Sequence, residues 1–274
     1  MDAVCPDCRS RLPAPANEQV SRRRQFSDLA RVPITTAIIL INGLVFLAMT
    51  VSGVSATMPQ VPQLIRWGAN YVPLTLSTEP WRLLSSNYVH IGILHIALNM
   101  WCLWNLGGLA ERIFDRWTYL LTYSACGVAG SIVSLSWHRL AVGAGASGAI
   151  FGMAGALIAA LYFGNLPIPR RALQPTLKSL LSFAGYNLFF GTVIPGIDNS
   201  AHLGGLVSGL ILGTVLARHL TSPVEVRNWW RLWVFIVAGV ILLLGFHFVR
   251  HFESGLEVGG IDRLSIITFV FSDS

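Results

Sequence analysis

Long apolar segments separated by shorter polar ones dominate this chain of 274 residues. A helix needs about 20 predominantly apolar residues to cross the hydrocarbon core of a bilayer, and seven segments approach that length. The least apolar of them is the fifth, because it carries Ser182, Tyr186, Asn187 and Thr192. The pattern predicts an all-α polytopic membrane protein with spans at residues 34–53, 92–110, 117–136, 147–163, 179–195, 200–218 and 230–249.

Composition and charge agree with membrane insertion. Hydrophobic residues make up 53% of the chain and charged residues 12%, whereas a soluble domain carries about 25% charge. The net charge is +6, but the basic residues are scattered, so we interpret them as a topology signal and not as a nucleic-acid-binding surface.

The distribution of basic residues predicts the orientation. With a cytoplasmic N-terminus and seven alternating spans, 14 of the 19 Lys and Arg residues fall inside and the other 5 outside. The positive-inside rule favours this arrangement. We therefore expect a cytoplasmic N-terminus and an outside C-terminus, in what we take to be the bacterial inner (cytoplasmic) membrane.

Four regions follow from this topology: a cytoplasmic tail at 1–32, a six-helix membrane core at 33–220, a seventh transmembrane helix at 221–250 and an outer tail at 251–274. The first tail contains Cys5 and Cys8, a CxxC pair that could be half of a zinc site or a redox pair. Because no second CxxC or His pair lies nearby, one chain lacks four zinc ligands. We expect no metal and no cofactor.

The longest outer segment lies between the first two spans, at residues 54–91. Loops of this length are often functional. This one carries aromatic residues suited to the membrane interface, namely Trp67, Tyr71, Trp81 and Tyr88.

Polar residues in three spans share one predicted depth. Ser147 begins the fourth span, His202 begins the sixth, and His95 and Asn99 lie near the start of the second. All three spans run from outside to inside in the predicted topology. Because intramembrane polar residues are costly and usually face the protein interior or a water-filled cavity, we expect these four to meet near the outer surface.

The residue types suggest nucleophilic catalysis. A serine hydroxyl becomes a good nucleophile when a nearby base takes its proton, and His202 is the obvious base. We find no acidic residue near it, so we predict a Ser-His dyad and not a triad. His95 and Asn99 share a helix face and can donate to an oxyanion, as can the N–H of Ser147 at a helix N-terminus.

Small residues flank both candidate groups. Gly145 and Gly148 allow close approach to Ser147, and Gly205 and Gly209 form a small-xxx-small face that would bring the sixth span against the fourth. Each piece alone also has a purely structural interpretation, such as tight helix packing. Their combination at one depth is what favours catalysis.

Over about residues 80–210, the chain resembles the rhomboid intramembrane serine proteases. The resemblance rests on Trp81-Arg82, on the run from His90 to Asn99, on Leu106 to Arg112, on Gly145-Ala146-Ser147-Gly148, and on Ala201-His202-Leu203-Gly204-Gly205 with Gly209.

The resemblance implies a six-helix core that is open to water from the outer side, with Ser147 as nucleophile and His202 as base. It implies an oxyanion site at His95, Asn99 and the Ser147 amide, and substrates that are single-pass transmembrane proteins entering past the fifth span. Supporting residues would be Gly145, Gly148, Phe151, His90, Trp81, Arg82, Gly205 and Gly209.

Two positions depart from the family pattern. Phe151 stands where the family usually has a tyrosine that packs on the histidine ring, and Asp115 stands where it commonly has a glycine. Inactive relatives lack the serine or the histidine, so the presence of both favours an active enzyme. A non-proteolytic membrane chaperone or retention factor is the alternative, and a small transporter is a weaker one. The seventh span resembles that of family variants with one helix added after the core.

Overall fold

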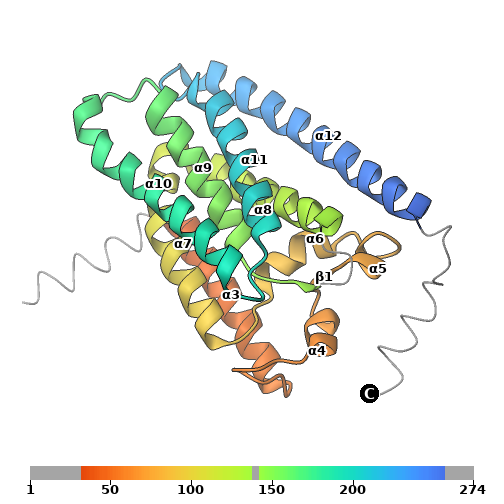
Figure 1. Cartoon of the computed structure of the whole chain (residues 1–274). Coiled ribbons are helices and arrows are strands. Elements are labelled where there is room, and N and C mark those ends of the chain that lie inside the picture. The colour runs from red at the N-terminus through yellow and green to blue at the C-terminus, as the bar shows by residue number, and fades with distance from the viewer. Residues whose placement is uncertain (1–31, 138–141, 257–274) are drawn as a thin grey trace, which may run out of the picture.

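The computed structural model describes residues 32–137 and 142–256, and long helices form most of that part of the chain (Figure 1). Each predicted span corresponds to one helix. The long helices are α3 (Pro33–Val51), α7 (Ile93–Phe114), α8 (Arg116–Trp137), α9 (Ser147–Phe163), α10 (Arg170–Val193), α11 (Asn199–Ala217) and α12 (Val224–Leu256).

Five of these helices, α3, α7, α8, α11 and α12, are long and apolar enough to cross a membrane. The α9 helix is apolar but shorter, with 17 residues. The α10 helix begins at Arg170, earlier than predicted, and its polar first turns contain Arg171, Pro175 and Lys178. The α12 helix is also longer than the predicted span, because helical structure continues through polar residues at both of its ends.

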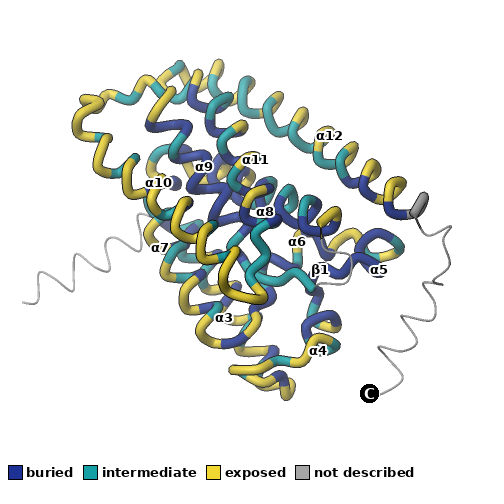
Figure 2. The backbone as a smooth tube through the Cα atoms, viewed as in Figure 1, coloured by how far each residue is buried: buried dark blue, intermediate teal, exposed yellow. Residues whose placement is uncertain are grey.

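The centre of the bundle is α9. Nearly all of its side chains are buried, as the dark blue tube shows (Figure 2), while α3, α7, α10 and α12 carry many exposed apolar side chains. The α9 helix is rich in Gly and Ala, which lets backbones approach closely when lipid offers no hydrophobic drive for association. Helices α8 and α11 pack directly against it.

The contact between α9 and α11 is a contact between backbones. A Cβ on Gly205 would lie 2.0 Å from the Gly148 carbonyl oxygen, and one on Gly209 would lie 1.9 Å from that of Gly152. Real Cβ atoms do not come this close to an oxygen. The predicted small-xxx-small face on the sixth span is therefore confirmed, and its partner is the helix that begins at Ser147.

Residues 54–91, which the predicted topology places outside and which we call the outer segment, are folded into short elements. The outer segment contains α4 (Val61–Arg66), β1 (Asn70–Tyr71), α5 (Val72–Thr75), α6 (Arg82–Ser85) and the 3-10 turn η1 (Ser86–Tyr88). Strand β1 pairs antiparallel with β2 (Val142–Gly143), which lies just before Ser147. The hydropathy pattern does not reveal this pairing, because each strand has only two residues.

The α12 helix is attached to the bundle near both ends. Near its start, Arg231 forms an ion pair with Asp115, in the turn between α7 and α8. Asp115 has a φ of 61°, which is uncommon for a residue other than glycine, and its Oδ1 accepts hydrogen bonds from the N–H groups of Trp117 and Thr118. Near the other end, Phe246 and Val249 pack in one cluster with residues of the outer segment.

The first turn of α3 is capped from another helix. The N-cap residue of α3 is Val32, and its side chain accepts no hydrogen bond from the helix. Instead the buried Glu111 carboxylate of α7 accepts hydrogen bonds of 2.9 Å from the N–H groups of Ile34 and Thr35 and from the Thr35 hydroxyl. Glu111 thus satisfies donors that a helix N-terminus otherwise leaves without partners.

Replacing Glu111 with Ala should lower the free energy of unfolding by about 2 to 3 kcal/mol, because three buried donors lose a charged acceptor. Thermal unfolding in detergent measures this change. The matched control is Arg112→Ala, since Arg112 is adjacent but exposed. Equal unfolding temperatures for the two variants would contradict the capping role.

Candidate active site

Ser147 is positioned by a turn that only glycine fits. Gly145 has a φ of 127°, in the region that L side chains rarely adopt, and its N–H donates to the Ser86 carbonyl at 2.9 Å. A Cβ on Gly145 would lie 2.6 Å from the Cε1 atom of His95. The chain therefore leaves β2, passes against His95 and starts α9 at Ser147.

The same turn places backbone donors beside the hydroxyl. Ser147 is the first residue of α9, and the first N–H groups of a helix have no acceptor within it. The N–H of Ile150 is the one that closes the first turn, on the Ala146 carbonyl. The N–H groups of Ser147, Gly148 and Ala149 can therefore stabilise a negative charge that develops nearby.

His202 lies in the first turns of α11 and is 7% exposed. Its ring stacks on Phe151 with a centroid separation of 4.2 Å and an interplanar angle of 13°. Phe151 lies one turn after Ser147 on α9. The phenylalanine at this position therefore supports the imidazole by ring contact, without a hydroxyl.

Ser147 and His202 lie on adjoining turns of the two most closely packed helices. Gly148, next to Ser147, faces the Ala201 carbonyl, and Gly205, one turn after His202, faces the Gly148 carbonyl. Within residues 32–137 and 142–256, no direct hydrogen bond joins the two side chains, and the buried Nδ1 of His202 has no partner. Catalytic hydrogen bonds are often long before a substrate binds.

The predicted oxyanion donors are placed differently from each other. His95 lies against Gly145, and its Nδ1 accepts from the Ile91 N–H at 3.3 Å. Asn99 is buried, but its Nδ2 donates to the His95 carbonyl of its own helix at 2.9 Å. The structure thus brings His95 beside the turn that carries Ser147, and Asn99 into a bond within α7.

The supporting residues of the outer segment organise that segment itself. Arg82 is buried, donates to the carbonyls of Ile65 and Ala69, and pairs with Glu79 at 2.6 Å. The Arg82 guanidinium also lies over the ring of Trp81, at 4.8 Å from its centroid, and Trp81 itself is mostly exposed.

His90 anchors the end of the outer segment. It is fully buried, its Nδ1 lies 3.4 Å from the Tyr88 carbonyl, and its ring centroid is 5.2 Å from that of His95. Burial, with a smaller contribution from His95, lowers the pKa of His90 to about 3. His90 is therefore uncharged at neutral pH.

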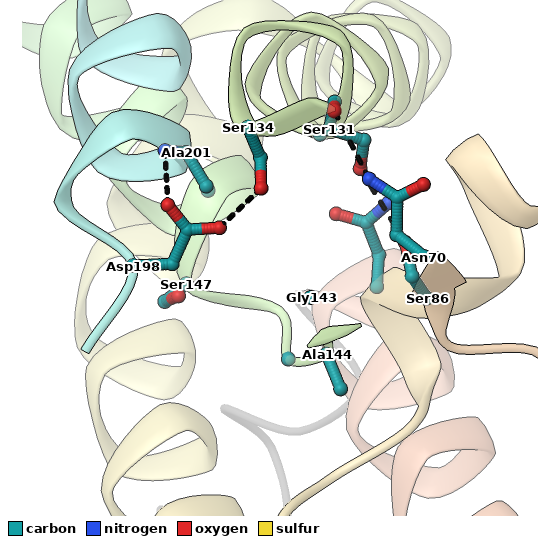
Figure 3. Close-up of a pocket in the computed structure, with 13 residues that line it drawn as sticks. Asn70, Ser86, Ser131, Ser134, Gly143, Ala144, Ser147, Asp198 and Ala201 are labelled. Atoms are coloured by element: carbon teal, nitrogen blue, oxygen red, sulfur yellow. Dashed lines mark hydrogen bonds between the residues drawn. The ribbon is translucent and has the colours of Figure 1, made fainter. Parts of the chain in front are cut away.

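A polar cavity adjoins Ser147 (Figure 3). About 30 Å³ of it is open to the centres of water molecules, which is room for about two waters. It is lined by hydroxyl, amide and carboxylate groups from the outer segment, α8, α9 and the start of α11. Those polar lining residues are Asn70, Ser86, Asn87, Ser131, Ser134, Ser147 and Asp198. His202, His95 and Asn99 do not line it.

Asp198 corrects one prediction. We predict a dyad with no acidic residue near His202, yet Asp198 precedes His202 by four residues. The Asp198 side chain caps α11 by accepting from the Ala201 N–H at 3.0 Å. The signal was available, because Asp is a favoured N-cap residue just before a helical segment.

Metal-binding groups do not cluster in the described part of the chain, where no three His, Cys, Asp or Glu residues gather as metal ligands would. Cys5 and Cys8 lie outside the described residues, as does the tail 257–274.

Comparison with known proteins gives a consistent result. The Rhomboid domain model matches residues 77–219. The chain is 33% identical to rhomboid protease GluP of Bacillus subtilis over 222 residues, which is 81% of this chain and 42% of that protein.

Two further relatives show the same similarity. RHOMBOID-like protein 4 of Arabidopsis thaliana is 38% identical over 50% of this chain and 34% of its own length, and rhomboid protease AarA of Providencia stuartii is 26% identical over 70% of this chain and 75% of its own. The chain thus spans less than half of GluP and of RHOMBOID-like protein 4. Because the domain match covers more than half of this helical membrane protein, the chain belongs to the rhomboid family.

Proposed function

We propose that this protein is an intramembrane serine endopeptidase that cleaves transmembrane segments of single-pass membrane proteins, with Ser147 as nucleophile and His202 as general base. The observation that carries the proposal is the start of α9. There, a serine with free backbone N–H groups lies against the α11 turn that presents a buried, ring-stacked imidazole.

The proposed chemistry is acyl transfer followed by hydrolysis. The Ser147 hydroxyl oxygen attacks the scissile carbonyl while His202 takes the hydroxyl proton, and His202 then gives that proton to the leaving amine. The N–H groups at the start of α9 and the His95 ring donate to the oxyanion. Asn99 joins them only if its amide leaves the His95 carbonyl. A water from the adjoining cavity then hydrolyses the acyl-enzyme.

The substrate must unwind locally before it can react. A transmembrane helix satisfies its backbone groups by internal hydrogen bonds, which shield the amides in lipid. We propose that substrates enter past α10, whose second half exposes apolar and aromatic side chains such as Tyr186, Phe189 and Phe190. The proposal places the site near the outer face of a bacterial inner membrane, with the core at 33–220 and a cytoplasmic N-terminus.

Fragment analysis tests this proposal. The protein is co-expressed with a tagged single-pass membrane protein, and the products are identified by mass spectrometry. We expect two fragments with new ends inside the transmembrane segment. When purified enzyme and purified substrate are mixed instead, the same fragments should be lost if the enzyme is first treated with a fluorophosphonate. Cleavage that persists after this treatment, or cuts confined to soluble regions, would contradict the proposal.

A non-proteolytic chaperone or retention factor is the second candidate. The departure at Phe151 and the missing direct hydrogen bond between Ser147 and His202 favour it, because both weaken the support of a catalytic base. It predicts that the single-pass protein co-purifies intact with the wild type, and that fluorophosphonate treatment leaves this association unchanged.

A further inference from the structure

The carboxylate of Asp198 is held rigidly at the N-terminus of α11. Its Oδ1 accepts from the Ala201 N–H at 3.0 Å and from the Ser200 hydroxyl at 2.5 Å, and its Oδ2 accepts from the Ser134 hydroxyl of α8 at 2.5 Å. Two of these donors, Ser134 and Ala201, are drawn with dashed bonds in Figure 3. All three donors are neutral, so they orient the carboxylate without neutralising its charge.

This negative charge faces the candidate site. Asp198 and Ser147 line the same cavity and lie at the same side of it in Figure 3. The His202 N–H donates to the Asp198 carbonyl at 3.2 Å, so the two residues are one helical turn apart. The titratable groups that interact electrostatically with the His202 ring are Asp198 and, from α7, His95.

A charge is needed at this point of the proposed reaction. When His202 takes the proton of Ser147, it becomes a buried imidazolium, and a buried charge is costly unless an opposite charge or hydrogen bonds stabilise it. Its Nδ1 has no hydrogen-bond partner among the residues that the structure describes. A nearby fixed carboxylate can stabilise the imidazolium through space, as the acid of a triad does by contact.

We propose that Asp198 is a positioning residue that stabilises the imidazolium form of His202 during catalysis, in addition to capping α11. The proposal rests on the proposed protease function. It replaces the simple dyad by a dyad with a fixed carboxylate one turn away, which acts without touching the reacting atoms.

Replacing Asp198 with asparagine separates its role as a helix cap from the role of its charge. Asparagine is as good an N-cap as aspartate, and its amide can bond to the same backbone N–H and hydroxyl groups, but it carries no charge. If Asp198 acts only as a cap, Asp198→Asn should leave both stability and turnover unchanged. If the charge matters, turnover alone should fall.

The experiment compares the full-length wild type with Asp198→Asn and with Glu225→Gln, which removes an exposed carboxylate at the start of α12. For each protein, kcat and KM for a transmembrane peptide and the midpoint of thermal unfolding are measured. For Asp198→Asn we expect a kcat about 10- to 100-fold lower, with KM and the midpoint unchanged, and for Glu225→Gln no change in any of the three.

Two results would overturn the proposal: an unchanged kcat in Asp198→Asn, or a lower kcat accompanied by a lower unfolding midpoint, which would make the loss of turnover a consequence of lost structure and not of lost charge. Failure of the proposed function is distinguishable, because the wild type would then neither cleave the peptide nor react with a fluorophosphonate. That outcome would remove the basis of this proposal as well.

Discussion

Replacement of Ser147 with Ala should abolish cleavage of a transmembrane substrate, lowering kcat by at least about 10³-fold. Alanine removes the attacking oxygen but keeps the backbone N–H and the helix start at this position, so substrate binding should persist and KM should change little. Turnover of a transmembrane peptide in detergent, together with labelling by a fluorescent fluorophosphonate, measures the effect.

Ser136→Ala is the matched control for this prediction. Ser136 is an exposed serine near the end of α8, and its hydroxyl donates to a carbonyl of its own helix. This control should retain full labelling and turnover. Labelling of Ser147→Ala at the wild-type level would show that another residue is the nucleophile.

The second large effect concerns the fold. Gly209→Ala should destabilise the protein by at least about 3 kcal/mol, because the new Cβ would lie 1.9 Å from the Gly152 carbonyl oxygen and would force two backbones apart. The same movement would separate the turn of His202 from that of Ser147. The temperature of thermal unfolding and the rate of fluorophosphonate labelling should therefore both decrease.

Gly239→Ala provides the comparison. A Cβ at Gly239 of α12 would meet nothing within 4 Å, and alanine favours a helix by about 1 kcal/mol over glycine. This variant should be as stable as the wild type or slightly more so. If Gly209→Ala unfolded at the same temperature as Gly239→Ala, the close contact of α9 with α11 would not be needed for stability.

Much of the architecture could be predicted from hydropathy, because lipid requires long apolar helices whose backbones satisfy themselves. The all-helical membrane fold is confirmed, and so is the small-residue contact at Gly205 and Gly209. The spacing of these glycines along one helix is displayed directly in the sequence.

Features that depend on contacts between distant parts of the chain could not be predicted from the sequence. The pairing of β1 with β2 involves two residues from each strand, far apart in the chain, and Glu111 caps a helix that begins 78 positions earlier. The residue type of Asn99 also does not tell whether its amide bonds to its own helix or points toward the site. Asp198 is different, since its position four residues before His202 is visible in the sequence.

The ion pair between Asp115 and Arg231 bears on any attempt to move or remove the seventh helix. A glycine in this turn adopts its left-handed backbone at no steric cost, whereas aspartate there is strained and leaves a charge that Arg231 neutralises. The Asp115 carboxylate and the Arg231 guanidinium therefore depend on each other. Engineering that transplants α12 onto a six-helix relative, or trims it from this chain, would have to exchange both ends of that bond at once.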